Sequence, residues 1–236
     1  MFLRTGRRQH IMCTVSSSVD EFASLFANKT VAAVGPSGHL MGKGLGQKID
    51  SYDLICRFNE VRPKGLENDY GSRVDVMFWH LNSCDMKDFK LYANSDLEGF
   101  KSSKLLVYPR QHGDVNRRGC SKSRTPKENA EQLPDVPFYQ VDTNKVRQWE
   151  NKYSAHLTVG VLGLMMIMET SFKELFVSGF SFYKSEKTYH PAHPTHLNIT
   201  KTKVHGGREG IQALRDNMKN KKNITGDYLF EETILT

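Results

Sequence analysis

The feature that most constrains this chain is a short apolar run near its N-terminus that breaks abruptly into glycine and serine. Residues 31–34 read Val-Ala-Ala-Val and are followed at once by Gly35-Pro36-Ser37-Gly38. A second short, mainly apolar run at 54–58 ends at Asn59. An apolar run that stops at a Gly/Ser turn is typical of a buried strand that carries its turn to a ligand. Two such strand ends predict one nucleotide pocket at the carboxyl edge of a parallel sheet.

Strand-like and helix-like runs alternate along the rest of the chain, which predicts a mainly parallel central sheet flanked by helices. We expect further strands at 74–78, 104–108, 137–141 and 175–177, and helices at 18–26, 145–153, 160–170 and 209–219. Residues 111–127 are rich in Gly, Arg and Ser and predict a long loop. The expected organisation is an N-terminal lead-in, residues 1–29, and a single α/β Rossmann-like domain, residues 30–236.

Composition favours a folded protein with anionic partners. Of 236 residues, 38% are hydrophobic and 25% are charged, with a formal net charge of +7. Such a surface favours nucleotides, acidic sugars or nucleic acid. No RNA-binding aromatic pattern accompanies the basic residues, so we expect no nucleic-acid partner.

Targeting and redox signals are weak. The longest apolar run, 159–168, is shorter than the roughly 18 residues that a membrane helix needs, and no apolar segment follows the basic N-terminus. The sequence therefore predicts a soluble, cytoplasmic protein with no transmembrane segment. The four cysteines form no Cys-x-x-Cys pair, which favours free thiols over disulfides.

Two common phosphate-binding fingerprints fail on spacing. A P-loop is excluded because only three residues separate Gly38 from Gly42, and Lys43 is followed by Gly44 rather than Ser or Thr. The dinucleotide fingerprint fails because Gly42, Gly44 and Gly46 form Gly-x-Gly-x-Gly with no strand directly before them. Another nucleotide-dependent enzyme on a Rossmann-like sheet stays open as a weaker alternative.

Read together, the residues from 35 to 73 resemble the large motif of the sialyltransferases, glycosyltransferase family 29. The matching residues, in order, are Gly35-Pro36-Ser37-Gly38, Gly46, Ile49-Asp50-Ser51-Tyr52-Asp53, Arg57-Phe58-Asn59 and Gly65-Leu66-Glu67-Asn68-Asp69-Tyr70-Gly71-Ser72-Arg73. Animal members usually carry Asn where this chain has Pro36. The missing membrane anchor and motif cysteines make the chain similar to a compact bacterial, algal or viral-type member.

The resemblance extends to a second motif at 156–180. Thr158 and Gly160 match the family's Ser-Thr-Gly helix start with Val159 in place of a hydroxyl, and Gly179 matches the turn that closes the motif. The implied fold is a sialyltransferase-type GT-A variant, with 30–236 as its catalytic domain. The implied donor-binding residues are Gly35, Ser37, Gly38, Asn59, Thr158, Gly160, Gly179 and Tyr189. Arg57 and Asn59, two residues apart at a strand end, are expected to point to the same side and face one pocket, whereas a structural role is favoured for the turn Gly71-Ser72-Arg73. From local sequence alone, Asn59 could equally make a structural hydrogen bond and Thr158 could equally be a simple N-cap.

A histidine-rich segment follows, with His190, His193, His196 and His205. Zinc binding is an alternative, but two prolines interrupt the segment and the spacing matches no structural zinc module. The resemblance implies instead that His190 or Tyr189 meets the donor phosphate and that His205 is the general base. An imidazole suits that role because it can accept a proton at neutral pH.

The implied function is an inverting, metal-independent transfer of sialic acid or a related ulosonic acid from a CMP-sugar to a hydroxyl of a glycan or glycoconjugate. We expect no cofactor beyond this donor substrate and no metal. Pro36, Val159 and a His205–Glu209 interval one residue shorter than in most members motivate an alternative, a CMP-binding pseudoenzyme. The loops that would choose the acceptor carry no recognisable signal.

Overall fold

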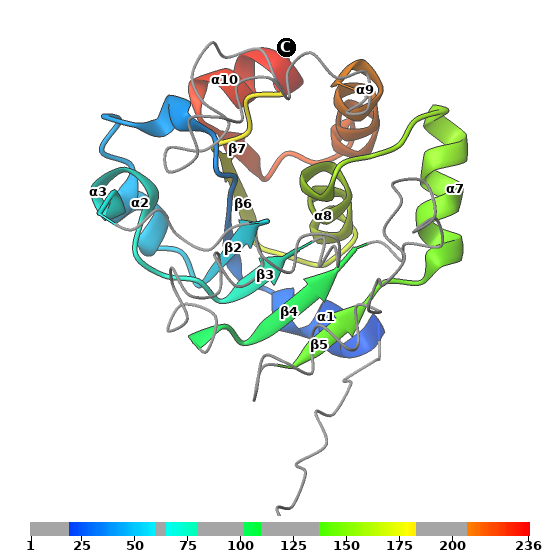
Figure 1. Ribbon diagram of the computed structural model, residues 1–236, viewed down its shortest axis with the longest axis horizontal. Coiled ribbons are helices and arrows are strands. Elements are labelled where there is room, and N and C mark those ends of the chain that lie inside the picture. The colour runs from blue at the N-terminus through cyan, green and yellow to red at the C-terminus, as the bar shows by residue number, and fades with distance from the viewer. Residues whose placement is uncertain (1–18, 60–64, 80–101, 110–136, 183–206) are drawn as a thin grey trace, which may run out of the picture.

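A single seven-stranded sheet forms the centre of the molecule, with the strand order β5-β4-β3-β2-β1-β6-β7 and every neighbouring pair parallel (Figure 1). The computed structural model describes residues 19–59, 65–79, 102–109, 137–182 and 207–236. The strands are β1 (Thr30–Val34), β2 (Leu54–Phe58), β3 (Val76–Phe78), β4 (Leu105–Tyr108), β5 (Phe138–Gln140), β6 (Glu174–Ser178) and β7 (Ile224–Gly226). The expected α/β fold with a parallel sheet is confirmed.

Helices cover both faces of this sheet, because alternate residues of each buried strand point to opposite sides. Val31 and Ala33 of β1 belong to the larger core cluster, together with residues of α1 (Val19–Phe26), α7 (Thr143–Tyr153), α8 (Val159–Met168) and α9 (Gly207–Met218). Ala32 and Val34 belong to a smaller cluster with residues of η1 (Gly38–Leu40), α2 (Gly46–Asp50) and α3 (Glu67–Tyr70). Figure 1 shows α2 and α3 on one side of the sheet and α8 on the other.

Helix α8 carries apolar residues on every side because the protein buries it on every side. Every residue from 161 to 168 is buried, and the helix packs beside α9. Gly163 brings α8 close to the sheet, since a Cβ there would lie 2.6 Å from the Phe58 ring and 2.8 Å from the Phe78 ring. The side chain of Thr158 caps the helix by accepting a hydrogen bond from the Val161 N–H.

The order of the strands creates a switch point between β1 and β6. From β1 the chain builds β2, β3, β4 and β5 outward in one direction, and then returns to add β6 and β7 on the other side. The connections that leave the carboxyl ends of β1 and β6 therefore diverge toward opposite faces. In open α/β sheets, ligands bind in the crevice formed at such a point.

The six strands and four longer helices that the sequence predicts are all present, with ends shifted by one or two residues. The sequence did not predict β7, α2, α3, α10 (Tyr228–Phe230) or the final π-helical turn η5 (Glu231–Leu235). The predicted loop at 111–127 lies outside the described residues. The division at residue 29 stays a prediction, although Phe22 and Phe26 of α1 are buried in the main core.

Cys56 is a free, buried thiol whose pKa is raised by burial.

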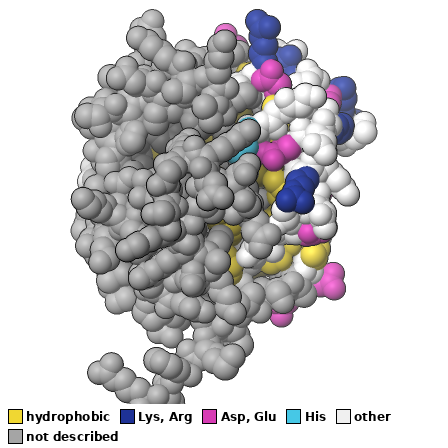
Figure 2. All heavy atoms as spheres, turned by 45° about the vertical axis from the view of Figure 1, so that its right-hand side comes forward, with side chains coloured by type: hydrophobic (Ala, Val, Ile, Leu, Met, Phe, Trp, Pro, Cys, Tyr) yellow, Lys and Arg dark blue, Asp and Glu magenta, His cyan; other side chains and the backbone are white. Residues whose placement is uncertain are grey.

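Where described residues reach the surface in Figure 2, acidic and basic side chains are interspersed. Helix α7 illustrates the pattern, since Lys145 pairs with Glu169 while Glu150 lies near His156. On this face the described part of the chain therefore presents mixed charge.

Candidate functional site

The turns that follow β1 and β6 meet at the switch point, and two glycines make this approach possible. The N–H of Gly35 donates to the Ser178 carbonyl oxygen (2.8 Å), and the N–H of Ser37 donates to the Gly179 carbonyl oxygen (3.0 Å). A Cβ on Gly35 would lie 2.4 Å from the Gly179 oxygen, and a Cβ on Gly179 would lie 2.2 Å from the Gly35 oxygen. Gly35 and Gly179, both predicted to bind the donor, thus lie side by side, with no side chain between their backbones.

Pro36 fits this arrangement because the two N–H groups that join the turns belong to its neighbours, Gly35 and Ser37. Directly after it, η1 begins at Gly38 and turns the chain away from the sheet. The Tyr70 hydroxyl on α3 donates to the Ser37 carbonyl oxygen (2.8 Å), which fixes the turn from the other side. Burial raises the pKa of that phenol, so it is a permanent donor at neutral pH.

The Ser37 side chain belongs to a buried chain of hydrogen bonds that the sequence did not predict. Its Oγ lies 3.0 Å from His39 Nδ1, and His39 Nε2 lies 2.9 Å from Asp227 Oδ2, across 188 residues of sequence. All three residues are less than 10% exposed. Asp227 also accepts from the Gly179 N–H (2.8 Å), which ties this chain of hydrogen bonds to the second turn.

The Asp227 carboxylate is held in its ionised form. Burial alone would raise its pKa, but hydrogen bonds from His39 and from the N–H groups of Phe230 and Gly179 lower the pKa below its usual value. Asp227 is also the N-cap of α10, accepting from Leu229 and Phe230. The only sequence signal for this residue was its cap position after Gly226.

Asn59 ends β2 at the same edge of the sheet in a left-handed conformation, with φ of 59°. This conformation is uncommon outside glycine, although asparagine tolerates it better than most residues, and such strain concentrates at functional sites. Its N–H donates to the Phe78 carbonyl oxygen (2.7 Å), so the backbone of β2 and β3 holds it in place. The positive φ also ends the regular alternation of β2, so Asn59 need not point to the same side as Arg57.

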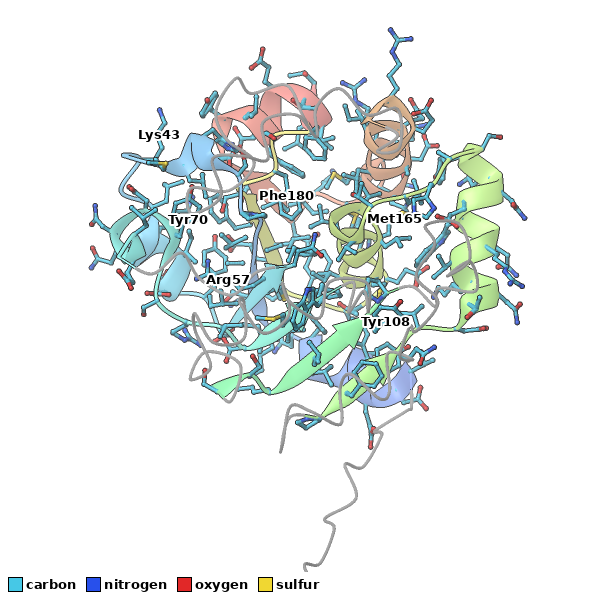
Figure 3. The ribbon with its side chains drawn as sticks, viewed as in Figure 1. Lys43, Arg57, Tyr70, Tyr108, Met165 and Phe180 are labelled. Carbon is cyan, nitrogen blue, oxygen red and sulfur yellow. The ribbon has the colours of Figure 1, made fainter. Side chains whose placement is uncertain are left out.

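Phe180 joins the first turn of α8 to the two glycine turns. Its ring atoms would lie 2.9 Å from a Cβ on Gly160 and 3.2 Å from a Cβ on Gly35. The ring also meets Phe58 edge-on, with centroids 5.0 Å apart. Figure 3 places this half-buried ring between the α2–α3 layer and α8. Gly35 and Gly160 therefore both lie against the ring of Phe180, the residue that follows Gly179.

The start of α9 lies beside the start of α8. Gly210 approaches so closely that a Cβ there would lie 3.1 Å from Val161 Cγ2. Helix α9 begins at Gly207, and Glu209 is exposed in its first turn. The predicted residues Tyr189, His190 and His205 lie outside the described residues, so their roles stay predictions. Within the described ranges, no group of three or more His, Cys, Asp or Glu side chains is arranged to hold a metal ion.

The motif residues at 49–57 and 65–73 hold one another in place by hydrogen bonds beside the two turns, and we call this segment the brace. Arg57 is 1% exposed, and its guanidinium donates to the carbonyl oxygens of Gly71 and Arg73 rather than facing the crevice. Its predicted place in the pocket is wrong, because the turn at 71–73 supplies buried acceptors that the cation satisfies. Figure 3 shows Arg57 on the side of the sheet that carries α2 and α3.

Asp50 organises the same turn from the other direction. Its carboxylate accepts from the N–H groups of Ser72 (2.8 and 2.9 Å) and Arg73 (3.1 Å) and from the Ser72 hydroxyl (2.9 Å). Burial opposes ionisation, but these hydrogen bonds lower its pKa. Asp69 similarly accepts from the N–H groups of Gly42 and Gly44 and so shapes the loop after η1. The structural role predicted for Gly71-Ser72-Arg73 is confirmed.

Comparison with known proteins decides the family. A family model described as glycosyltransferase family 29 (sialyltransferase) matches residues 15–216. The chain belongs to glycosyltransferase family 29. This match covers both glycine turns, α8 and most of α9, so the predicted family is confirmed.

Individual relatives match this family 29 chain over shorter stretches. The mouse CMP-N-acetylneuraminate-beta-galactosamide-alpha-2,3-sialyltransferase 2 is 44% identical over 75 residues, 32% of this chain and 21% of that protein. A rice protein, sialyltransferase-like protein 2, is 34% identical over 83 residues, 34% of this chain and 21% of the relative. The matched segment thus spans about a fifth of each relative's length.

The fold also matches solved structures. The sialyltransferase CstII from Campylobacter jejuni, in complex with the substrate analogue CMP-3FNeuAc, superposes with a TM-score of 0.52 at 16% identity. The alignment covers 87% of this family 29 chain and 85% of that structure. At this identity the likeness shows a shared fold. Among the described residues, no helix has both the length and the apolar character to span a membrane.

Proposed function

We propose that this family 29 protein transfers sialic acid, or a related ulosonic acid, from a CMP-sugar to a glycan hydroxyl. The observation that carries the proposal is the meeting of Gly35 and Gly179 at the switch point of a parallel sheet. The N–H groups of Gly35, Ser37 and Gly179 already serve the two turns and Asp227, so the Gly38 N–H and the Ser37 hydroxyl are the groups proposed to meet a phosphate. The similarity to CstII, solved with CMP-3FNeuAc, supports a CMP-linked donor.

The donor fits the residues gathered around the crevice. Asn59 offers an amide that can both donate and accept at the carboxyl end of β2. Thr158 and Gly160 open α8, where the positive end of the helix dipole favours an anion. The Thr158 hydroxyl accepts from the Val161 N–H and keeps its own proton for a further acceptor.

The proposed reaction is a direct displacement with inversion. His205 removes the proton of the acceptor hydroxyl, and the hydroxyl oxygen bonds to the anomeric carbon of the donor sugar. The bond from that carbon to the CMP phosphate oxygen breaks at the same time. The leaving phosphate keeps the electron pair, and His190, Tyr189 or backbone N–H groups stabilise its charge. The position of α9 supports His205 as the base, because the helix that begins two residues later packs beside the start of α8. We propose that no metal takes part.

Binding and turnover measurements test the proposal. Titration calorimetry with CMP, followed by hydrolysis and transfer assays with CMP-sialic acid and CMP-Kdo, should show binding and turnover of at least one donor. The His205→Ala variant should transfer sugar about 10²–10⁴-fold more slowly while binding CMP as before, because it loses only the general base. An unchanged rate would remove His205 from the mechanism. Tight CMP binding without turnover of any CMP-sugar would favour the pseudoenzyme.

A further inference from the structure

The hydrogen-bonded chain Ser37–His39–Asp227 links the first glycine turn to the C-terminal segment. His39 is 1% exposed, and each of its ring nitrogens has one partner within 3.0 Å. The resemblance that identified the motif assigns a role to Ser37 and none to His39 or Asp227. What the ring does depends on which of its nitrogens carries a proton.

Asp227 fixes one of the two positions. Its Oδ1 accepts from the N–H groups of Leu229 and Phe230, and its Oδ2 accepts from the Gly179 N–H and faces His39 Nε2. A carboxylate surrounded by three backbone donors is an acceptor only. His39 Nε2 therefore carries a proton, and the charge of the ring depends on whether Nδ1 carries one too.

The state of His39 Nδ1 sets the direction of the Ser37 hydroxyl. When the ring is neutral, Nδ1 is an acceptor and the Ser37 O–H donates to it across 3.0 Å. The hydroxyl can then only accept from a ligand. When the ring is protonated, Nδ1–H donates to Ser37 Oγ, and the hydroxyl proton is free to donate elsewhere.

We propose that His39 is a positioning residue that couples binding of the donor's phosphate at Ser37 to the uptake of one proton at Nδ1. The proposal rests on the proposed function, in which the turn at 35–38 receives that phosphate. A phosphate oxygen is an acceptor, so it engages Ser37 only when the hydroxyl donates to it. The anion also opposes the cost of charging a buried ring, and the Asp227 carboxylate compensates the imidazolium from the other side.

The other titratable groups around His39 leave this coupling intact. The Tyr228 ring packs edge-on against His39 with centroids 5.9 Å apart, and Lys43 Nζ lies 5.3 Å from the centroid of that tyrosine ring. Tyr70 reaches the Ser37 carbonyl oxygen rather than the imidazole. Among the described residues, Asp227 is thus the anionic partner of the ring, and Lys43 lies on the Tyr228 ring that packs against it.

Calorimetry of CMP binding at about pH 7.5, in two buffers of different ionisation enthalpy, measures the protons taken up. A phosphate monoester itself titrates near pH 6, so the informative quantity is the difference between variants. The wild-type protein should take up as much as about one proton more than His39→Gln, whose neutral amide replaces the imidazole. Ser37→Ala should take up as few protons on CMP binding as His39→Gln. Both variants should bind CMP about tenfold or more weakly than wild type. Cytidine, which lacks the phosphate, should bind without this difference.

A double-mutant cycle separates positioning from general destabilisation. If His39 acts through Ser37, adding His39→Gln to Ser37→Ala should change CMP affinity less than twofold, roughly. Equal proton uptake by wild type and His39→Gln, or an undiminished effect of His39→Gln in the Ser37→Ala background, overturns the proposal. Should His39→Gln fail to fold, the comparison of wild type with Ser37→Ala gives the same proton count. Failure of the wild-type protein to bind CMP at any pH overturns the proposed function itself.

Discussion

The two halves of the large motif lie next to each other in sequence but in different chemical surroundings. The first half, at 35–38, is built of glycine backbone and one hydroxyl, and it meets the β6 turn at the switch point. In the second half, at 49–58 and 65–75, charged side chains such as Asp50, Arg57 and Asp69 direct their hydrogen-bonding groups at other parts of the protein. Arg57 and Asp50, for example, are both committed to the turn at 71–73.

This difference separates the two reasons for which a motif residue is needed. Residues of the first half leave space, the Ser37 hydroxyl and the Gly38 N–H for a ligand, so changing them should alter binding. Residues of the second half satisfy buried polar groups, so changing them should alter the free energy of unfolding. A shared motif therefore does not imply a shared role.

The largest effect is expected from Gly179→Ala. The new Cβ would lie 2.2 Å from the Gly35 oxygen, at a residue whose φ is +74°. We expect the turns to separate, with CMP affinity lowered about 100-fold or more and the free energy of unfolding lowered by about 2–4 kcal/mol. Calorimetry and urea denaturation measure the two effects.

Gly65→Ala is the matched control, because Gly65 has a φ of +81° but nothing within 4 Å of its Cβ position. It should show the conformational cost, about 1–2 kcal/mol, with normal CMP affinity. Equal losses of affinity in both variants would contradict the role assigned to the contact between the two turns.

Much of the first half could be predicted from sequence, but the hydrogen bonds from His39 and Asp227 that hold it could not. The break from 31–34 into Gly35 and Ser37 is a local pattern, and so are the strands on either side of it. Asp227 and His39 are 188 residues apart, and β7, which brings Asp227 to the site, has only three residues. No local pattern carries such a pairing, because it depends on which strand is added next to β6.

The direction of a side chain was equally hard to predict. Alternation along β2 places Arg57 and Asn59 on one side only if the strand stays extended through both. The left-handed φ of Asn59 ends that regularity, and the buried carbonyl oxygens of Gly71 and Arg73 draw the guanidinium elsewhere. Both causes depend on tertiary structure. The sequence could therefore single out Arg57 and Asn59, but it could not predict where the Arg57 side chain points.

Arg57→Met should produce the largest change in stability within the brace. It keeps much of the side-chain volume but leaves the Gly71 and Arg73 carbonyl oxygens without their buried donor. The free energy of unfolding should fall by about 2–4 kcal/mol, while the folded protein binds CMP within about twofold of wild type. Arg73→Met, at a side chain that is 41% exposed, should cost less. A fall in CMP affinity without a fall in stability would place Arg57 in the pocket after all.

Asn59→Gly tests, with little structural cost, the residue at the end of β2 that we propose as a donor ligand. Glycine accepts a φ of 59° without strain, so the free energy of unfolding should stay within about 1 kcal/mol of wild type. The variant lacks the side-chain amide, and CMP should bind about tenfold more weakly. Thermal denaturation and calorimetry give both numbers. Normal CMP affinity would assign Asn59 to the brace.

The smallest effect is an acid dependence carried by the brace. Hydrogen bonds keep the pKa of Asp50 below its unfolded value, so its contribution is complete above about pH 5 and is lost as pH falls through the folded pKa. The stability difference between wild type and Asp50→Asn should therefore be constant above about pH 5 and narrow as the pH is lowered from about 5 toward 2. Urea denaturation across this range measures it. A difference that stays constant would mean that ionisation of Asp50 contributes nothing.

The most direct test of the division between binding turns and brace is hydrogen exchange with and without CMP. Peptides that cover 35–40 and 158–163 should exchange more slowly when CMP is present, because the bound nucleotide would cover the Gly38 N–H and the first turn of α8 and hold both turns closed. Peptides that cover 49–53 and 71–75 should exchange at unchanged rates, since their donors already serve Asp50 and the sheet. Protection of the second pair without the first would contradict the central claim.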